Sequence, residues 1–168
     1  GNVYFTVGMK APLEFMGIQE LDQPYGKVHR LRDDGQIPAD NPFVNTPGAL
    51  KSIWTYAHRS TQGLEWNPLT REMWSTEMAL PPRHFCHTNS PALSSFVFYA
   101  GKAFPGWRGN ILVGTLRATD LLRLEIVDNK VVHTEVLLKD LARFRDIEIG
   151  PQGDLYLLLE NAAGSRIV

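Results

Sequence analysis

The chain has 168 residues, of which 43% are hydrophobic and 21% charged, an ordinary composition for one globular domain with a buried core. A net charge of −1 gives no indication of binding to nucleic acid or to an anionic membrane surface. The single cysteine, Cys86, excludes a disulfide framework within the chain, and no apolar run approaches the ~20 residues that a membrane-spanning helix needs. We expect a single domain over residues 1–168. We expect no signal peptide, because strand-like residues follow Gly1 directly.

The predicted elements are strands from the first residues onward. Val3–Val7 is a β-branched and aromatic run, and Lys27–Arg32 alternates apolar with polar side chains before a turn at Asp33-Asp34-Gly35. The pair Asp128-Asn129 predicts a tight hairpin. No window of 12 or more residues has a helical stripe, so we expect an all-β protein. Further strands are predicted at 51–57, 63–67, 72–77, 94–99, 110–116, 120–127, 130–138, 144–149 and 154–160.

Two segments of the sequence repeat one another. Gly63–Pro68 followed by Met73–Thr76 parallels Asp146–Pro151 followed by Leu155–Leu158, each with a short strand, a proline-containing turn and a second strand that carries an aromatic residue. Repeats spaced by about 40 residues, or twice that, are typical of β-propeller blades. A β-sandwich also has many short strands but does not predict such a repeat. We therefore expect a partial β-propeller with about three to four blades.

Four groups of motifs follow one another along the chain: Gly26–Leu31 with Asp34–Phe43, Tyr56–Leu64, Phe104–Asn110 with Val113–Arg117, and Arg143–Asp146 with Gly150–Tyr156. Together they resemble the glucose/sorbosone dehydrogenase family, the soluble bacterial aldose sugar dehydrogenases that depend on pyrroloquinoline quinone (PQQ). The resemblance covers most of the chain. It implies a six-bladed propeller, a small sugar substrate, PQQ and calcium as cofactors, and a periplasmic or secreted location.

The resemblance also implies which residues face the cofactor. PQQ is a flat tricarboxylate, so its site needs several cationic groups on one surface. The family pattern assigns this role to Arg59, Arg117, Arg143 and Arg145, and a further contact to Thr88. The i, i+2 spacing of Arg143 and Arg145 predicts that both lie on one face of a strand, but two solvated arginines would have the same spacing.

The sequence departs from the family pattern where the chemistry is expected. The family's general base is a histidine upstream of the segment that matches Val3–Gly8, so we expect this chain to lack it. Gly8 is followed by Met9, where the family has an acidic residue. Met78–Pro82 replaces the acidic loop that supplies calcium ligands, and we expect roughly one blade, ~40 residues or more, to be missing there.

Two interpretations of the function remain open. The first is a sugar dehydrogenase that is impaired or inactive in this form. The second is a non-catalytic propeller module that binds an anionic or carbohydrate ligand, or associates with itself to complete a ring. The run His84-Phe85-Cys86-His87 contains zinc-ligand types, but its adjacent spacing favours a packed loop. The tryptophans could stack on sugars, but we expect them to pack between blades; they are Trp54, Trp66, Trp74 and Trp107.

Overall fold

A computed structural model describes residues 1–9, 17–77 and 91–168. The described residues form strands and one short 3-10 turn, η1 (Pro105–Trp107), with no α-helix, which confirms the all-β prediction. None of the helical turns in these ranges is long and apolar enough to cross a membrane. The strands are β1 (Asn2–Val7), β2 (Lys27–Arg32), β3 (Ile53–Tyr56), β4 (Thr61–Trp66), β5 (Met73–Glu77), β6 (Leu93–Phe98), β7 (Ile111–Thr115), β8 (Leu121–Val127), β9 (Lys130–Leu138), β10 (Arg143–Ile149), β11 (Leu155–Asn161) and β12 (Gly164–Ile167).

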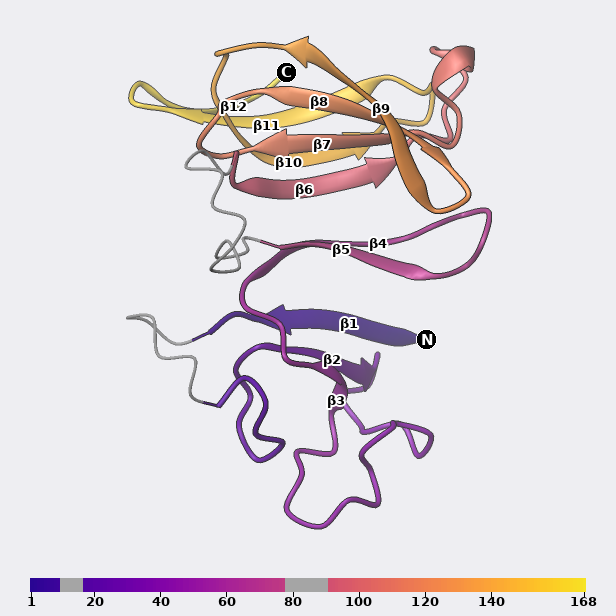
Figure 1. Ribbon diagram of the computed structural model, residues 1–168, viewed down its shortest axis with the longest axis vertical. Helices are drawn as coiled ribbons and strands as arrows, with labels where there is room; N and C mark the ends of the chain where they lie inside the picture. Colours follow the sequence, from indigo (N-terminus) through magenta and orange to yellow (C-terminus); the bar gives the residue numbers. More distant parts are fainter. Residues whose placement is uncertain (10–16, 78–90) are drawn as a thin grey trace. The chain divides into compact units, whose positions relative to one another are not determined.

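Strands that follow one another in the chain also lie next to one another in the sheets. The sheets have the orders β1-β2-β3, β4-β5, β6-β7-β8-β9 and β10-β11-β12, and Figure 1 labels their strands. Short sheets of consecutive strands are the blades of a propeller. The predicted partial β-propeller is therefore confirmed, with four sheets where we expected about three to four blades.

The chain divides into two compact units. Unit 1 contains Gly1–Thr61 and Glu77–Ala79, and unit 2 contains Gln62–Thr76 and Leu80–Val168. Unit 1 therefore holds the β1-β2-β3 sheet, and unit 2 holds the other three sheets.

The sheet of unit 1 is anchored by buried polar residues of β2. The ammonium group of Lys27 donates hydrogen bonds to the carbonyl oxygens of Gly17, Ile18 and Tyr25 at 2.7–2.9 Å. Arg30 donates from Nε to Oδ1 of Asn41 at 2.6 Å, and its guanidinium group packs over the Trp54 ring. Because buried polar groups are costly unless they are hydrogen-bonded, these contacts fix the loops before and after β2.

Unit 2 has a core on each face of the β6–β9 sheet. The alternation of side chains along β6 sends Val97 and Tyr99 to one face and Phe96 and Phe98 to the other. The first face packs against the β10-β11-β12 sheet, with Phe144 and other residues of that sheet in the shared cluster. On the second face the ring of Trp74 from β5 packs edge-on against Phe98, with the ring centroids 5.5 Å apart.

Close contacts and hydrogen bonds join the three sheets of unit 2. Oγ1 of Thr76 on β5 accepts from the amide of Gly63 at 2.9 Å and donates to the carbonyl oxygen of Ser94 at 2.5 Å. Oγ of Ser94, in turn, donates to the carbonyl oxygen of Phe144 at 2.7 Å. A side chain at Gly114 could not fit, because its Cβ would lie 2.4 Å from Cβ of Phe144. The inner strands of the three sheets are thus held at a close separation.

Candidate functional site: an arginine-lined surface of unit 2

Arg143 and Arg145 lie at the start of β10. Both side chains are exposed, whereas Phe144 between them is fully buried. The prediction that they share one face of a strand is confirmed. The pairing of β10 with β11 shifts register between Phe144 and Asp146, so Arg145 occupies a bulge.

A carboxylate of the neighbouring strand contacts this pair. Glu160 on β11 lies opposite Arg143 in the sheet and accepts a short hydrogen bond from Nε of Arg145. This hydrogen bond is the main cause that lowers the pKa of Glu160 below its ordinary value, and the charges of Arg145 and Arg143 act in the same direction. The cluster of these three side chains keeps a net positive charge.

Arg143 borders a cavity of about 420 Å³. Thr119 and Asp140 also line it, and both have a left-handed backbone, with φ of 59° and 52°. The amide of Leu141 donates to the Thr119 carbonyl oxygen, and the amide of Asp140 donates to Oδ1 of Asp120. These bonds hold the loop before β10 against the loop after β7. Left-handed conformations in residues other than glycine are often found at ligand sites.

The loop after β7 also carries Arg117. Its backbone is fixed because the amides of Arg117 and Ala118 both donate to the carbonyl oxygen of Pro91, at 3.1 and 3.2 Å. The Arg117 side chain is exposed, and it forms no salt bridge with any residue in the described ranges. The structure thus brings Arg117, Arg143 and Arg145 to the same end of the sheets of unit 2.

Arg59 belongs to unit 1, and its Nε atom is buried. The carbonyl oxygen of Arg59 accepts from the amide of Met9 at 2.8 Å, so the segment after β1 runs beside it. The preceding residue, His58, is hydrogen-bonded through both ring nitrogens. Nδ1 lies 2.6 Å from Oε1 of Glu77, and Nε2 lies 2.7 Å from Oγ1 of Thr55. Thr88, the remaining predicted cofactor contact, lies outside the described residues.

A second cavity in unit 2, of about 220 Å³, is acidic. The carboxylates of Glu65 and Glu148 line it together with Trp66 and Phe98. Burial, and then the nearby Glu148 and Asp146, raise the pKa of Glu65 above its ordinary value. Because its lining, among the described residues, has two carboxylates and no cation, an anionic ligand is disfavoured at this second cavity.

The described residues contain no group of three or more His, Cys, Asp or Glu side chains that could hold a metal ion. His84, Cys86 and His87 lie outside the described ranges, as does the Met78–Pro82 segment that replaces the expected calcium loop.

The tryptophans are only in part core residues. Trp54 packs edge-on against Tyr4, Trp74 against Phe98 and Trp107 against Tyr99. The expectation of core packing is wrong for Trp66, whose residue surface is 47% exposed beside the acidic cavity. Trp66 is the last residue of β4 and is exposed, whereas Gly63 in the middle of the strand is buried.

Sequence reasoning missed Glu160, Thr119 and Asp140 at the arginine-lined surface. No local pattern signals Glu160, because the register that starts at the Gly150–Gly153 turn would place it opposite Phe144, and only the bulge at Arg145 brings it opposite Arg143. The positions of Thr119 and Asp140 depend on loop contacts between two hairpins, which no local pattern encodes.

The comparisons with known proteins agree with these features. The family model described as glucose/sorbosone dehydrogenase matches residues 1–81 and 79–168. Aldose sugar dehydrogenase YliI of Escherichia coli (strain K12) is 29% identical over 210 aligned positions, which cover 99% of this chain and 57% of that protein. A solved glucose dehydrogenase has a TM-score of 0.89 at 33% identity, covering 99% of this chain and 57% of that chain.

A more distant structure shows the fold alone. It is the PQQ-bound form of an aldose sugar dehydrogenase from Streptomyces coelicolor, with a TM-score of 0.66 at 18% identity, and the match covers 98% of this chain and 56% of that one. The chain thus spans little more than half the length of the proteins it matches.

The comparisons also bear on the predicted gap. The alignment with the Escherichia coli protein spans 210 positions although the chain has 168 residues, so roughly 40 positions have no counterpart here, about one propeller blade. The two segments of the family match meet at residues 79–81, where we expected the missing residues. With motifs, sheets and matches in agreement over the whole chain, the protein belongs to the glucose/sorbosone dehydrogenase family.

Proposed function

We propose that the arginine-lined surface of unit 2 is part of a binding site for an anionic quinone cofactor, PQQ. One observation carries this proposal: Arg143 lines a 420 Å³ cavity, Arg145 lies two residues further along β10 with its side chain exposed, and the loop that holds Arg117 also contributes Thr119 to the cavity wall. Guanidinium groups bind carboxylates in paired hydrogen bonds, which suits a tricarboxylate. The donor set therefore fits the cofactor.

In this proposal each residue has a separate role. Arg117 provides a cation that forms no salt bridge with the described residues, Arg143 provides a second cation opposite Glu160, and Glu160 holds Arg145 in place through its short hydrogen bond. Thr119 and Asp140 form the wall of the cavity beside them. When bound, PQQ would supply an acceptor for the hydride of a sugar, that is, one proton together with two electrons.

We infer that oxidation of aldose sugars by this chain alone is impaired. The relatives are named aldose sugar and glucose dehydrogenases, which supports an aldose as the ancestral substrate. Met9 cannot orient a base, and the described residues offer no group for a metal ion. Cofactor binding therefore persists without efficient turnover.

The test is a titration of the purified chain with PQQ, followed by quenching of tryptophan fluorescence, and a dye-linked assay with calcium and glucose. We expect saturable binding and little turnover. The double variant Arg143→Ala/Arg145→Ala should weaken binding at least tenfold, because two charge-assisted contacts are lost. Arg108→Ala is the control, since Arg108 is exposed near η1 at the other end of the β6–β9 sheet. Equal affinity in both variants would refute the proposed site, and rapid turnover by the wild-type chain would refute the impairment.

A second proposed property, self-association, rests on a separate observation. The β4-β5 sheet has two strands among the described residues, whereas the next sheet has four, and the two segments of the family match meet just after β5. A propeller with an incomplete blade exposes apolar surface that another chain can cover. We propose a homo-oligomer, which sedimentation velocity at micromolar concentration would detect.

A further inference from the structure

The outer half of the β6–β9 sheet has two chemically different faces. Along β8, Leu122, Leu124 and Ile126 point to the face that carries Phe96, Phe98 and Val113. The alternate residues Arg123 and Glu125 point to the other face, where Arg123 lies over the Trp107 ring, 5.7 Å from its centroid.

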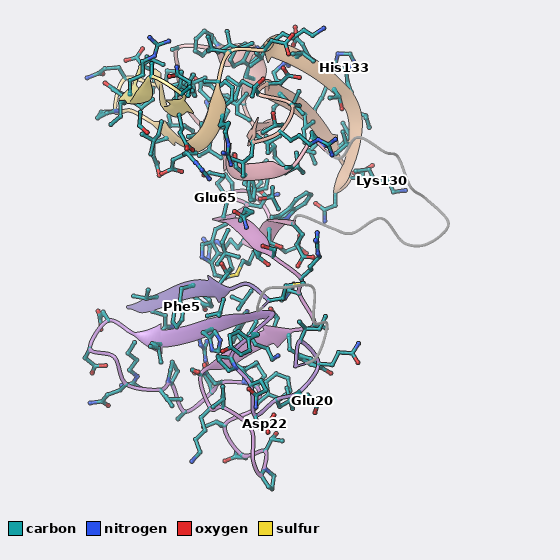
Figure 2. The ribbon with its side chains drawn as sticks, turned by 90° about the vertical axis from the view of Figure 1, so that its left-hand side faces the viewer. Phe5, Glu20, Asp22, Glu65, Lys130 and His133 are labelled. Atoms are coloured by element: carbon teal, nitrogen blue, oxygen red, sulfur yellow. The ribbon has the colours of Figure 1, made fainter. Side chains whose placement is uncertain are left out.

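The register of β9 extends this difference to the outer strand. Glu135 lies opposite Arg123 and bonds to it at 2.8 Å, and His133 lies opposite Glu125, so one face of the outer strands is charged. Figure 2 shows the labelled side chains of Lys130 and His133 on this outer strand. The other face has no charged residue. We call it the charge-free face; its members on β8 and β9 are Leu122, Leu124, Ile126, Val131, Thr134 and Val136.

The charge-free face is exposed in the described part of the chain. Val131 and Val136 have 52% and 48% of their surfaces accessible. Among the described residues, the β4-β5 sheet packs against this side through Trp74, near the inner strand β6, and its turn reaches the β8–β9 turn, where Nδ2 of Asn129 donates to Oε2 of Glu72 at 3.2 Å. A sheet face on which two valines are about half exposed, with Thr134 between them and no charged side chain, is unusual for a surface in contact with water.

The break in the family match accounts for the lack of a sheet over the charge-free face among the described residues. It falls at residues 79–81, directly after β5, and roughly 40 aligned positions have no counterpart in this chain. Two more strands of about 6 residues each, with their turns, would need fewer residues than that. Strands that extended the β4-β5 sheet outward would lie over the outer strands of the next sheet, where the charge-free face is.

We propose that a second copy of this chain packs its own charge-free face against this one. This inference rests on the proposed self-association and names its surface. A twofold arrangement brings the same patch of each copy together, and because the patch has no charge, no like charges meet. Two apolar sheet faces pack about 10 Å apart with their side chains interdigitated, which removes the exposed valines of both copies from water.

The test compares two identical substitutions on opposite faces of the sheet. Val136→Glu places a carboxylate on the charge-free face, and Val127→Glu places one on the charged face, opposite Lys130, at a position that is 49% exposed. Sedimentation velocity should give twice the 18.9 kDa of one chain for the wild type and for Val127→Glu. Val136→Glu should raise the dissociation constant at least tenfold, because two unpaired carboxylates would be buried.

Cross-linking tests the same face without weakening it. In a Cys86→Ser background, Val136→Cys should give covalent dimers with a short bis-maleimide, and Val127→Cys should not. Circular dichroism confirms that each variant is folded. If the wild type is dimeric but the variants at positions 136 and 127 have the same dimer affinity and the same cross-linking, the charge-free face is not the interface, although self-association stands. A monomeric wild type would overturn both, whatever the result of the PQQ titration.

Discussion

Nδ1 of His58 lies 2.6 Å from Oε1 of Glu77, so the last residue of β5 is tied to the residue before Arg59. Glu77 also accepts from Oγ1 of Thr61, and His58 bonds to Thr55 through its other ring nitrogen. Four side chains from β3, β4, β5 and the β3–β4 loop are therefore connected. In unit 1 these bonds fix the backbone that carries Arg59.

Glu77→Ala should destabilise unit 1. The substitution removes two hydrogen bonds and leaves His58 with one partner, so we expect the free energy of unfolding to fall by about 1–2 kcal/mol. Urea denaturation followed by tryptophan fluorescence measures the change. Glu125→Ala, which alters an exposed carboxylate on β8, should change it by less than about 0.5 kcal/mol. Equal effects would show that the His58–Glu77 contact contributes nothing.

Glu160→Gln should strengthen the binding of PQQ. The substitution removes the negative charge beside Arg143 and Arg145, so the surface becomes more cationic, and we expect the affinity to rise about threefold or more at low salt. Glu135→Gln is a matched control, because Glu135 forms the same kind of pair with Arg123 elsewhere in unit 2. Weaker binding by Glu160→Gln would show that the orientation of Arg145 matters more than the charge.

Glu65→Gln should make stability less dependent on pH. Burial and the carboxylates of Glu148 and Asp146 raise the pKa of Glu65 above 4.5, so the folded state holds a proton that the unfolded state releases. The wild type therefore loses this contribution as pH rises from 4.5 through the raised pKa. The neutral glutamine avoids that loss, and the variant should be more stable than the wild type at pH 7 but not at pH 4. Thermal melts at both values measure the difference, and the same difference at both would contradict the assignment.

Gly114→Ala should destabilise unit 2. The added Cβ would lie 2.4 Å from Cβ of Phe144 and 2.9 Å from Oγ of Ser94, so the sheets must move apart. We expect a loss of about 2–3 kcal/mol in the free energy of unfolding, as for other overpacked cores. Gly106→Ala adds the same methyl group where nothing lies within 4 Å, and should leave stability unchanged. Chemical denaturation of both variants tests the close packing of the inner strands.

The strands were the most predictable part of the fold. Their apolar and polar alternation is local, so β1 through β11 could be located from the sequence, and the hairpin at Asp128 and Asn129 is confirmed by positive φ angles of 49° and 59°. The sequence did not predict β12, because Gly164–Ile167 has one large apolar residue and is exposed throughout. Its pairing depends on β11, which no local pattern reveals.

The candidate site was only partly predictable. The spacing of Arg143 and Arg145 placed them on one face, because strand geometry alone determines this. The bulge at Arg145, the carboxylate of Glu160 and the cavity beside Thr119 arise from the pairing of β10 with β11 and from contacts between loops. These features depend on segments far apart in the chain. That three of the four arginines act on one ligand stays a prediction.

The hydrogen bonds from Gly63 through Thr76 and Ser94 to Phe144 have a consequence for how unit 2 responds to heat. Since each sheet is tied to the next near its inner strand, none can detach early without leaving a buried donor or acceptor unsatisfied. The three sheets should therefore melt in one cooperative transition, and amide protons of β4, β6 and β10 should exchange with solvent at similar, slow rates.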